Sequence, residues 1–134
     1  MSGKRREKMK YEVFAVDDEP EVLFLVKTGL KTAGFSVDAA GSADECLEKI
    51  LKKERAADLF LLDVFMPEKS GYDLIKELRK DERLKNSKMI FFTAAYAPKM
   101  KKKHRKLGAD MLIQKDVDYD DFVGSLQKCL SDGV

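Results

Sequence analysis

The sequence predicts one α/β domain built on a five-stranded parallel sheet with helices on both faces. Two observations lead to this prediction. Short apolar runs alternate strictly with stretches of helical periodicity, five of each, and this alternation is typical of βαβ units with right-handed crossovers. In addition, the runs 59–62 and 89–92 are continuously apolar, as expected for strands that are buried on both faces.

The expected strands share a short apolar or alternating pattern; they are 11–16, 35–40, 58–64, 88–93 and 109–114. The second strand alternates between apolar and polar residues, so we expect it at an edge of the sheet. The expected helices share apolar residues three and four positions apart; they are 21–33, 43–54, 71–80, 98–107 and 119–130. Ser42, followed by Glu45 three residues later, has the spacing of an N-cap that opens the second helix.

The composition favours a globular chain and excludes wholesale disorder, because 44% of the residues are apolar and 37% are charged. No apolar run approaches the roughly 20 residues needed to cross a bilayer. The basic segment 1–9 leads directly into a strand and contains no signal-peptide core. We therefore expect a cytoplasmic protein without membrane contact, in which a domain at 10–131 lies between a basic tail at 1–9 and a short tail at 132–134.

Cysteine and histidine give little indication of chemistry. Cys46 and Cys129 lie far apart and lack the spacing of a metal or redox motif, so we expect both to be structural and partly buried. His104 lies within a run of lysines and has no partner in the sequence, so we expect it at the surface without a catalytic role.

Polar residues stand at four of the five expected strand ends. In an open parallel α/β sheet, ligands bind beyond the carboxyl ends of the strands. We therefore expect these side chains to converge on one rim of the sheet; they are Asp17, Asp18, Asp63, Thr93 and Lys115.

The residue types at this rim suit phosphoryl transfer. Clustered carboxylates repel one another unless a cation lies among them, and Mg²⁺ prefers a few oxygen ligands together with water and phosphate. Asp17, Asp18 and Asp63 meet that need, and a carboxylate oxygen could then attack a phosphoryl group. Lys115 could pair with the phosphoryl oxygens and Thr93 could donate a hydrogen bond to them. Taken alone, Asp63 could equally be a carboxylate that caps the turn before Pro67.

The chain resembles the receiver domain of response regulators, the family that includes the single-domain chemotaxis regulator, over about residues 10–131. Four stretches support the resemblance: VDDEP at 16–20, LLDVFMP at 61–67 with Gly71 after it, FTA at 92–94, and GAD at 108–110 ahead of Lys115. Each stretch alone is a weak signal, but together they occur in the family's order and at its spacing. The fold that the resemblance implies is flavodoxin-like, with strand order 2-1-3-4-5.

The resemblance also implies a role for each residue of the rim. Asp63 would be the phosphoacceptor, and Mg²⁺, or Mn²⁺ in its place, would bind directly to Asp18, Asp63 and the backbone carbonyl of Phe65. Asp17 would act through a metal-bound water. On activation Thr93 would move toward the phosphoryl group, and the side chain of Lys115 would bridge to Asp63 or to its phosphate.

Two positions depart from the family pattern. Asp116 stands where the family usually has a proline, often after a cis peptide bond, and a cis bond before another residue costs about 3 kcal/mol. Leu112 stands where the family usually has Tyr or Phe as a rotamer switch coupled to the threonine. We therefore expect a trans or strained loop after the last strand and a different readout, in which the segment 94–98 shifts and Tyr96 changes its exposure.

The implied function is that of a signalling phosphoacceptor and not of an ordinary enzyme, although such a domain can catalyse its own phosphoryl transfer and dephosphorylation. The implied donor is a sensor histidine kinase or a phosphotransfer protein. We expect a downstream effector protein to bind the face formed by the 98–107 helix, the fifth strand and the last helix. The alternative is a degenerate receiver that serves as an interaction module without phosphorylation, a reading suggested by Leu112 and Asp116.

Other functional classes fit the sequence less well. An FMN binder of the same topology needs a phosphate-cradling loop where this chain has three consecutive acids at 17–19, and no dinucleotide-binding or P-loop motif is present. A dehalogenase-like phosphatase needs an acid where this chain has Phe65. The helix 98–107 is rich in lysine and arginine, but its charges surround the helix and no stacking aromatics accompany them, so specific nucleic-acid binding is not favoured.

Overall fold

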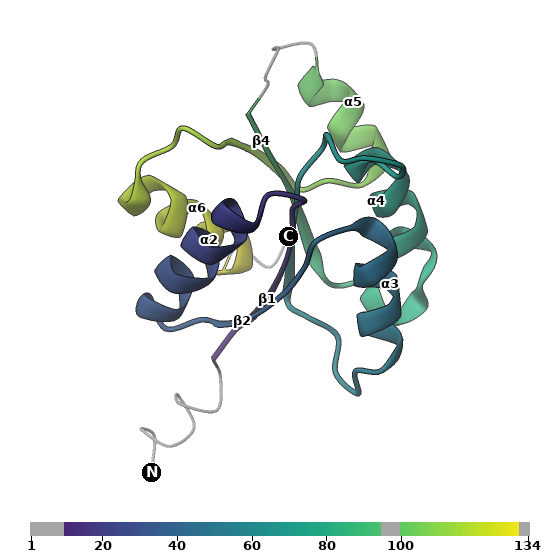
Figure 1. The fold of residues 1–134 in the computed structure, drawn as a ribbon, viewed down its shortest axis with the longest axis horizontal. Helices are drawn as coiled ribbons and strands as arrows, with labels where there is room; N and C mark the ends of the chain where they lie inside the picture. Colours follow the sequence, from purple (N-terminus) through teal and green to yellow (C-terminus); the bar gives the residue numbers. More distant parts are fainter. Residues whose placement is uncertain (1–9, 95–99, 132–134) are drawn as a thin grey trace.

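The computed structural model describes residues 10–94 and 100–131, and in these ranges it contains the five expected strands and five α-helices (Figure 1). The strands are β1 Glu12–Val16, β2 Ser36–Ala40, β3 Leu59–Leu62, β4 Lys88–Thr93 and β5 Met111–Gln114. The helices are α2 Pro20–Thr32, α3 Ala43–Leu51, α4 Gly71–Lys80, α5 Met100–Leu107 and α6 Tyr119–Ser131, with a short 3₁₀ turn, η1, at Glu82–Leu84. The tails 1–9 and 132–134, Tyr96 and the expected start of the 98–107 helix lie outside the described residues.

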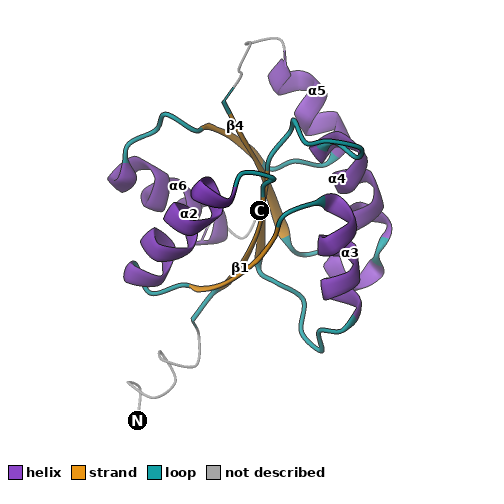
Figure 2. Ribbon diagram, viewed as in Figure 1, coloured by secondary structure: helices purple, strands orange, loops and turns teal. Residues whose placement is uncertain are grey.

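All neighbouring strands are parallel, and their order is β2-β1-β3-β4-β5. This confirms the predicted flavodoxin-like topology and places the alternating strand, β2, at an edge. Helices α2 and α6 cover one face of the sheet, whereas α3, α4 and α5 cover the other (Figures 1 and 2). Because all five strands are parallel, each helix returns the chain to the same end of the sheet before the next strand begins. The carboxyl ends of all five strands therefore lie along one rim.

The apolar core consists of two clusters, one on each face of the sheet. Side chains alternate in direction along a strand, so Phe60 and Leu62 join the cluster beneath α3 and α4, whereas Leu59 and Leu61 join the one beneath α2 and α6. This double burial explains why β3 has no polar residue. Each cluster also contains a cysteine, Cys46 in the first and Cys129 in the second. Burial raises the pKa of the Cys46 thiol to about 12, which agrees with a structural role.

Helix ends follow the local capping chemistry. The Ser42 hydroxyl accepts a hydrogen bond from the amide of Glu45 at 3.1 Å, and α4 begins with a complete capping box between Ser70 and Asp73. Helix α3 ends at Leu51, three residues before the expected end at 54. The next residues are charged and offer no apolar side chain that would hold another turn against the sheet.

The expected surface position of His104 is wrong. Its side chain is only 2% exposed. Met100, His104 and Leu107 are spaced four and three residues apart, so they share the face of α5 that meets the rest of the domain. The charged residues of α5 point to solvent and leave this imidazole as the most buried side chain of the helix.

The structure contains no described helix with the length and apolar composition needed to span a membrane.

Gly71, the first residue of α4, packs directly against the backbone that follows β3, and we predict that it tolerates no side chain. A Cβ atom at this position would collide with the carbonyl oxygen of Asp63 and would lie 3.0 Å from the Cα atom of Val64. Gly71→Ala should therefore lower the free energy of unfolding by about 1–3 kcal/mol, measured by urea denaturation. Gly124→Ala is the matched control, because nothing lies within 4 Å of its added Cβ atom in α6; it should raise stability by about 0.5–1 kcal/mol. Equal stabilities of the two variants would contradict this packing.

Candidate functional site

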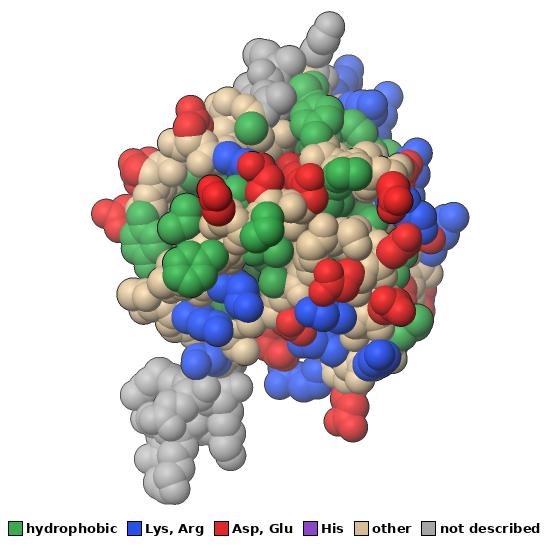
Figure 3. Space-filling model, viewed as in Figure 1, with side chains coloured by type: hydrophobic (Ala, Val, Ile, Leu, Met, Phe, Trp, Pro, Cys, Tyr) green, Lys and Arg blue, Asp and Glu red, His purple; other side chains and the backbone are tan. Residues whose placement is uncertain are grey.

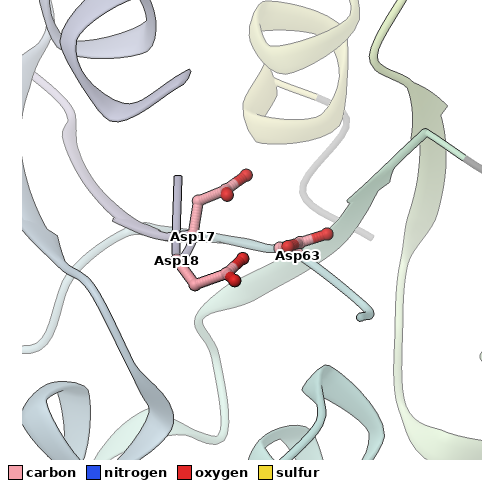
Figure 4. A group of neighbouring side chains, drawn as sticks. All are labelled: Asp17, Asp18 and Asp63. Atoms are coloured by element: carbon pink, nitrogen blue, oxygen red, sulfur yellow. The ribbon is translucent and has the colours of Figure 1, made fainter. Parts of the chain in front are cut away.

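Three carboxylates meet at the carboxyl ends of the two central strands. Val16 of β1 pairs in register with Leu62 of β3, so the residues that follow them lie side by side. Asp17, Asp18 and Asp63 each offer a carboxylate oxygen, and these atoms lie within 4.8 Å of one another (Figure 4). Asp17 and Asp63 are 3% and 4% exposed, whereas Asp18 is open to solvent. The group is a pocket with two buried acids and one exposed acid at its mouth.

Asp63 differs in one detail from the prediction, because it follows β3 and does not lie within it. The strand ends at Leu62, although it was expected to run to 64. The amide of Asp63 still donates to the carbonyl of Val16 at 2.9 Å, which ties it to β1. The chain then turns, and the amide of Gly71 closes the turn by donating to the carbonyl of Val64 at 2.8 Å.

Lys115 supplies the positive charge of the pocket. Its Nζ atom lies 2.7 Å from Oδ2 of Asp17 and 3.4 Å from Oδ1 of Asp63, and its side chain is 14% exposed. The backbone amide of Lys115 donates to the carbonyl of Thr93 at 2.9 Å, so the end of β4 fixes the point from which the side chain reaches across the rim. The amide of Glu19 holds the other oxygen of Asp17 at 2.9 Å, which leaves Oδ2 directed at the lysine.

Burial and neighbouring charges shift the pKa values of Asp63 and Lys115. The pKa of Asp63 is raised to about 6, first by burial and then by the negative charge of Asp17, while Lys115 opposes both effects. Burial alone would lower the pKa of Lys115, but its hydrogen bond and charge interactions with Asp17 and its attraction to Asp63 outweigh burial, and the pKa is raised. Two buried carboxylates therefore share one ammonium group, and their mutual repulsion is only partly relieved.

The structure also places the remaining positions that the sequence singled out. Thr93 ends β4 and is fully buried, next to the strand that leads to Asp63. Phe65 lies two residues after Asp63 with its ring 57% exposed. No peptide bond among the described residues is cis, so the bond between Lys115 and Asp116 is trans. Leu112 is half-buried and packs against the cluster beneath α3 and α4.

One partner in the site was not predicted. Glu19 places Oε1 3.4 Å from Nζ of Lys115, as a third and more exposed anion beside the lysine. The sequence hint for Glu19 was its position directly after Asp17 and Asp18. Its partner, Lys115, lies 96 positions away in the sequence. Local pattern carries no information about such a contact.

Comparison with known proteins agrees with this geometry. Residues 13–127 match the family model described as response regulator receiver domain. The chain is 31% identical over 119 residues to the transcriptional regulatory protein CpxR of Klebsiella pneumoniae, an alignment that covers 89% of this chain and 49% of that protein. The chain spans about half the length of the curated relatives that it matches first.

Two solved structures are similar over nearly their whole length. The chemotaxis protein CheY4 of Vibrio cholerae has a TM-score of 0.84 at 27% identity, covering 90% of this chain and 99% of that one. The response regulator protein TrrA of Thermotoga maritima, solved in complex with Mg²⁺-BeF, has a TM-score of 0.77 at 30% identity, covering 90% and 99%.

The raised pKa of Asp63 predicts a pH-dependent effect of its removal in metal-free solution. The folded state holds the Asp63 proton up to about pH 6, whereas the ordinary value is 3.8. The contribution of the Asp63 carboxyl group to the free energy of unfolding is therefore fully present below pH 3.8 and is lost as the pH rises through about 6. Asp63→Asn should be more stable than the wild type by about 1–3 kcal/mol at pH 8 in chelator, and the difference should shrink toward zero near pH 4. Urea denaturation at both pH values measures it, and a difference that does not change with pH would contradict the raised pKa.

Proposed function

Because the chain belongs to the response regulator receiver domain family, we propose that Asp63 is its phosphoacceptor and that Mg²⁺ is required for the transfer. The observation that carries the proposal is the pocket itself. Three carboxylates lie within 4.8 Å of one another, and Lys115 lies 3.4 Å from Asp63. A degenerate receiver is not favoured, because such a domain needs neither the cluster of acids nor the lysine.

The donor set fits a small divalent cation. Asp17, Asp18 and Asp63 bring three negative charges to a pocket in which Lys115 is the facing cation, so a divalent ion would relieve the remaining repulsion. We assign Asp18, Asp63 and the backbone carbonyl of Phe65 as direct ligands and Asp17 as a ligand through water, with Mn²⁺ able to substitute. The similarity to TrrA, which was solved with Mg²⁺-BeF, supports this choice of ion.

The residues of the chain then have distinct tasks in the transfer. When bound, the cation neutralises charge on the phosphoryl oxygens. An oxygen of ionised Asp63 forms the new O–P bond while the bond from phosphorus to the donor breaks and the donor departs with its electron pair. Lys115, already 3.4 Å from Asp63, pairs with the phosphoryl oxygens. The hydroxyl group of Thr93 donates a hydrogen bond to one of the phosphoryl oxygens.

The same groups would let the domain catalyse its own dephosphorylation, because they stabilise phosphoryl charge whether the attacking atom is a carboxylate or a water. The donor that we propose is a sensor histidine kinase or a phosphotransfer protein. Figure 3 shows acidic side chains gathered at the centre of one face, with basic side chains near α5 at its upper right. We propose that an acidic effector protein binds the face of α5, β5 and α6, where Lys101, Lys102 and Arg105 are exposed.

The site assignment predicts that acetyl phosphate adds one phosphoryl group to the protein, and only when a divalent metal is present. Intact mass measures the product as a single adduct. Asp63→Asn should stay unmodified because it lacks the nucleophilic oxygen. Asp18→Asn should be labelled at least about tenfold more slowly at limiting Mg²⁺, since loss of even an outer-shell partner of a metal ligand typically costs a factor of 10–100 and Asp18 is assigned as a direct ligand.

The control is Asp44→Asn, which removes an exposed carboxylate of α3 that pairs with Lys69. It should be labelled at the wild-type rate. Labelling of Asp63→Asn, or of the wild type in excess chelator, would refute the assignment of the site.

A further inference from the structure

His104 is a buried imidazole that the proposed phosphoryl transfer does not use. Its Nε2 atom lies 3.0 Å from the hydroxyl oxygen of Tyr72 in α4, and its ring centroid lies 4.6 Å from that of Phe91 in β4. Its Nδ1 atom is buried and has no hydrogen-bond partner among the described residues. Packing alone would be better served by an apolar side chain, which leaves no polar atom unsatisfied. The imidazole is therefore best explained by its bond to Tyr72.

Tyr72 connects this bond directly to the loop that carries Asp63. It is the second residue of α4 and follows Gly71, whose amide donates to Val64 at 2.8 Å. The backbone of Gly71 also packs so closely on the carbonyl of Asp63 that no Cβ atom fits between them. Any displacement of residues 63 and 64 therefore moves the first turn of α4, because closely packed backbone does not deform independently.

On its other side, Tyr72 contacts α5 twice. Besides the hydrogen bond to His104, the ammonium group of Lys103 lies 4.4 Å from the centroid of the Tyr72 ring. The tyrosine ring itself stands edge-on to Phe91 of β4, with centroids 5.5 Å apart and planes at 84°. Most other side chains of α5 are charged and exposed. The contacts of Tyr72 thus help to hold α5 in position, together with the packing of His104 on Phe91.

The pair also lies beside the position that lacks an aromatic ring. His104 and Leu112 line the same shallow hollow between α5 and β5. Leu112 cannot perform a ring rotation coupled to Thr93, so movement at Asp63 needs another contiguous path to α5. The path from Asp63 through Gly71 and Tyr72 to His104 is made entirely of direct contacts.

We propose that Tyr72 and His104 are positioning residues that transmit phosphorylation of Asp63 to α5 through their hydrogen bond. This inference rests on the proposed function of Asp63. Burial, with the nearby charge of Lys103, lowers the pKa of His104, so the imidazole is neutral near pH 7 and the connection is a bond between two neutral groups.

The test compares amide chemical shifts of the full chain in Mg²⁺ with and without beryllofluoride, a mimic of the phosphoryl group. In the wild type, residues 100–107 should shift on addition of the mimic. Tyr72→Phe keeps the ring and deletes only the hydroxyl, so the shifts at 100–107 should fall to less than half, whereas those around Asp63 and Thr93 and the affinity for beryllofluoride stay within twofold. Tyr119→Phe is the matched control, because it deletes a hydroxyl that donates to Gly29 at 2.8 Å between α6 and α2.

A second variant separates the hydrogen bond from packing. His104→Phe removes the other partner, and the double variant with Tyr72→Phe should lose no more of the shift at 100–107 than either single variant, because all three lack the same bond. Undiminished shifts in Tyr72→Phe with full beryllofluoride binding would overturn the inference and leave the proposed function intact. Equal losses in Tyr119→Phe would also overturn it, since they would indicate general loosening. A wild type that takes up no beryllofluoride would overturn the proposed function and this inference with it.

Discussion

The repulsion among three carboxylates at one rim of the sheet is the constraint on which the rest of this structure depends. Asp17 and Asp63 are almost completely buried, and one ammonium group, that of Lys115, faces both of them. Burying a charge is costly unless it is paired. The lysine therefore stabilises the arrangement only in part, and the remaining negative charge favours binding of a divalent cation, as the proposed function requires. Because the carboxylates repel one another without a cation, binding of a cation should change the energy of the site strongly.

The fold maintains this unfavourable arrangement by making everything around it rigid. The acids follow β1 and β3, which are neighbouring strands buried on both faces. Because this backbone is packed on both sides, the acids cannot move apart to reduce their repulsion. Gly71 packs directly on the carbonyl of Asp63, and Lys115 is held by the end of β4. The same rigidity explains how a local event can reach a distant surface, because displacement of one packed element must be accommodated by its neighbours.

Much of this arrangement could be predicted from the sequence, for physical reasons that also explain the failures. The parallel sheet followed from strict alternation, since parallel strands need crossovers, and the edge position of β2 followed from its alternating polarity. The strand order was implied by the resemblance to receiver domains. The rim followed because strand ends converge. The burial of His104 was missed because its sequence neighbours are charged, although its four- and three-residue spacing from Met100 and Leu107 places it on the inward face of α5. The ion pair of Glu19 with Lys115 joins distant segments, and only the folded chain brings them together.

The central claim is that burial and repulsion from Asp17 keep the pKa of Asp63 high in the absence of a cation, and the carboxyl titration of Asp63 tests it most directly. The measurement follows the ¹³Cγ chemical shift of Asp63 against pH, in chelator and in saturating Mg²⁺. In chelator the group should titrate near pH 6, as its raised pKa of about 6 requires, and in Mg²⁺ the midpoint should fall well below that because the cation favours the ionised form. A midpoint near the ordinary value of 3.8 in chelator that Mg²⁺ does not move would contradict the claim.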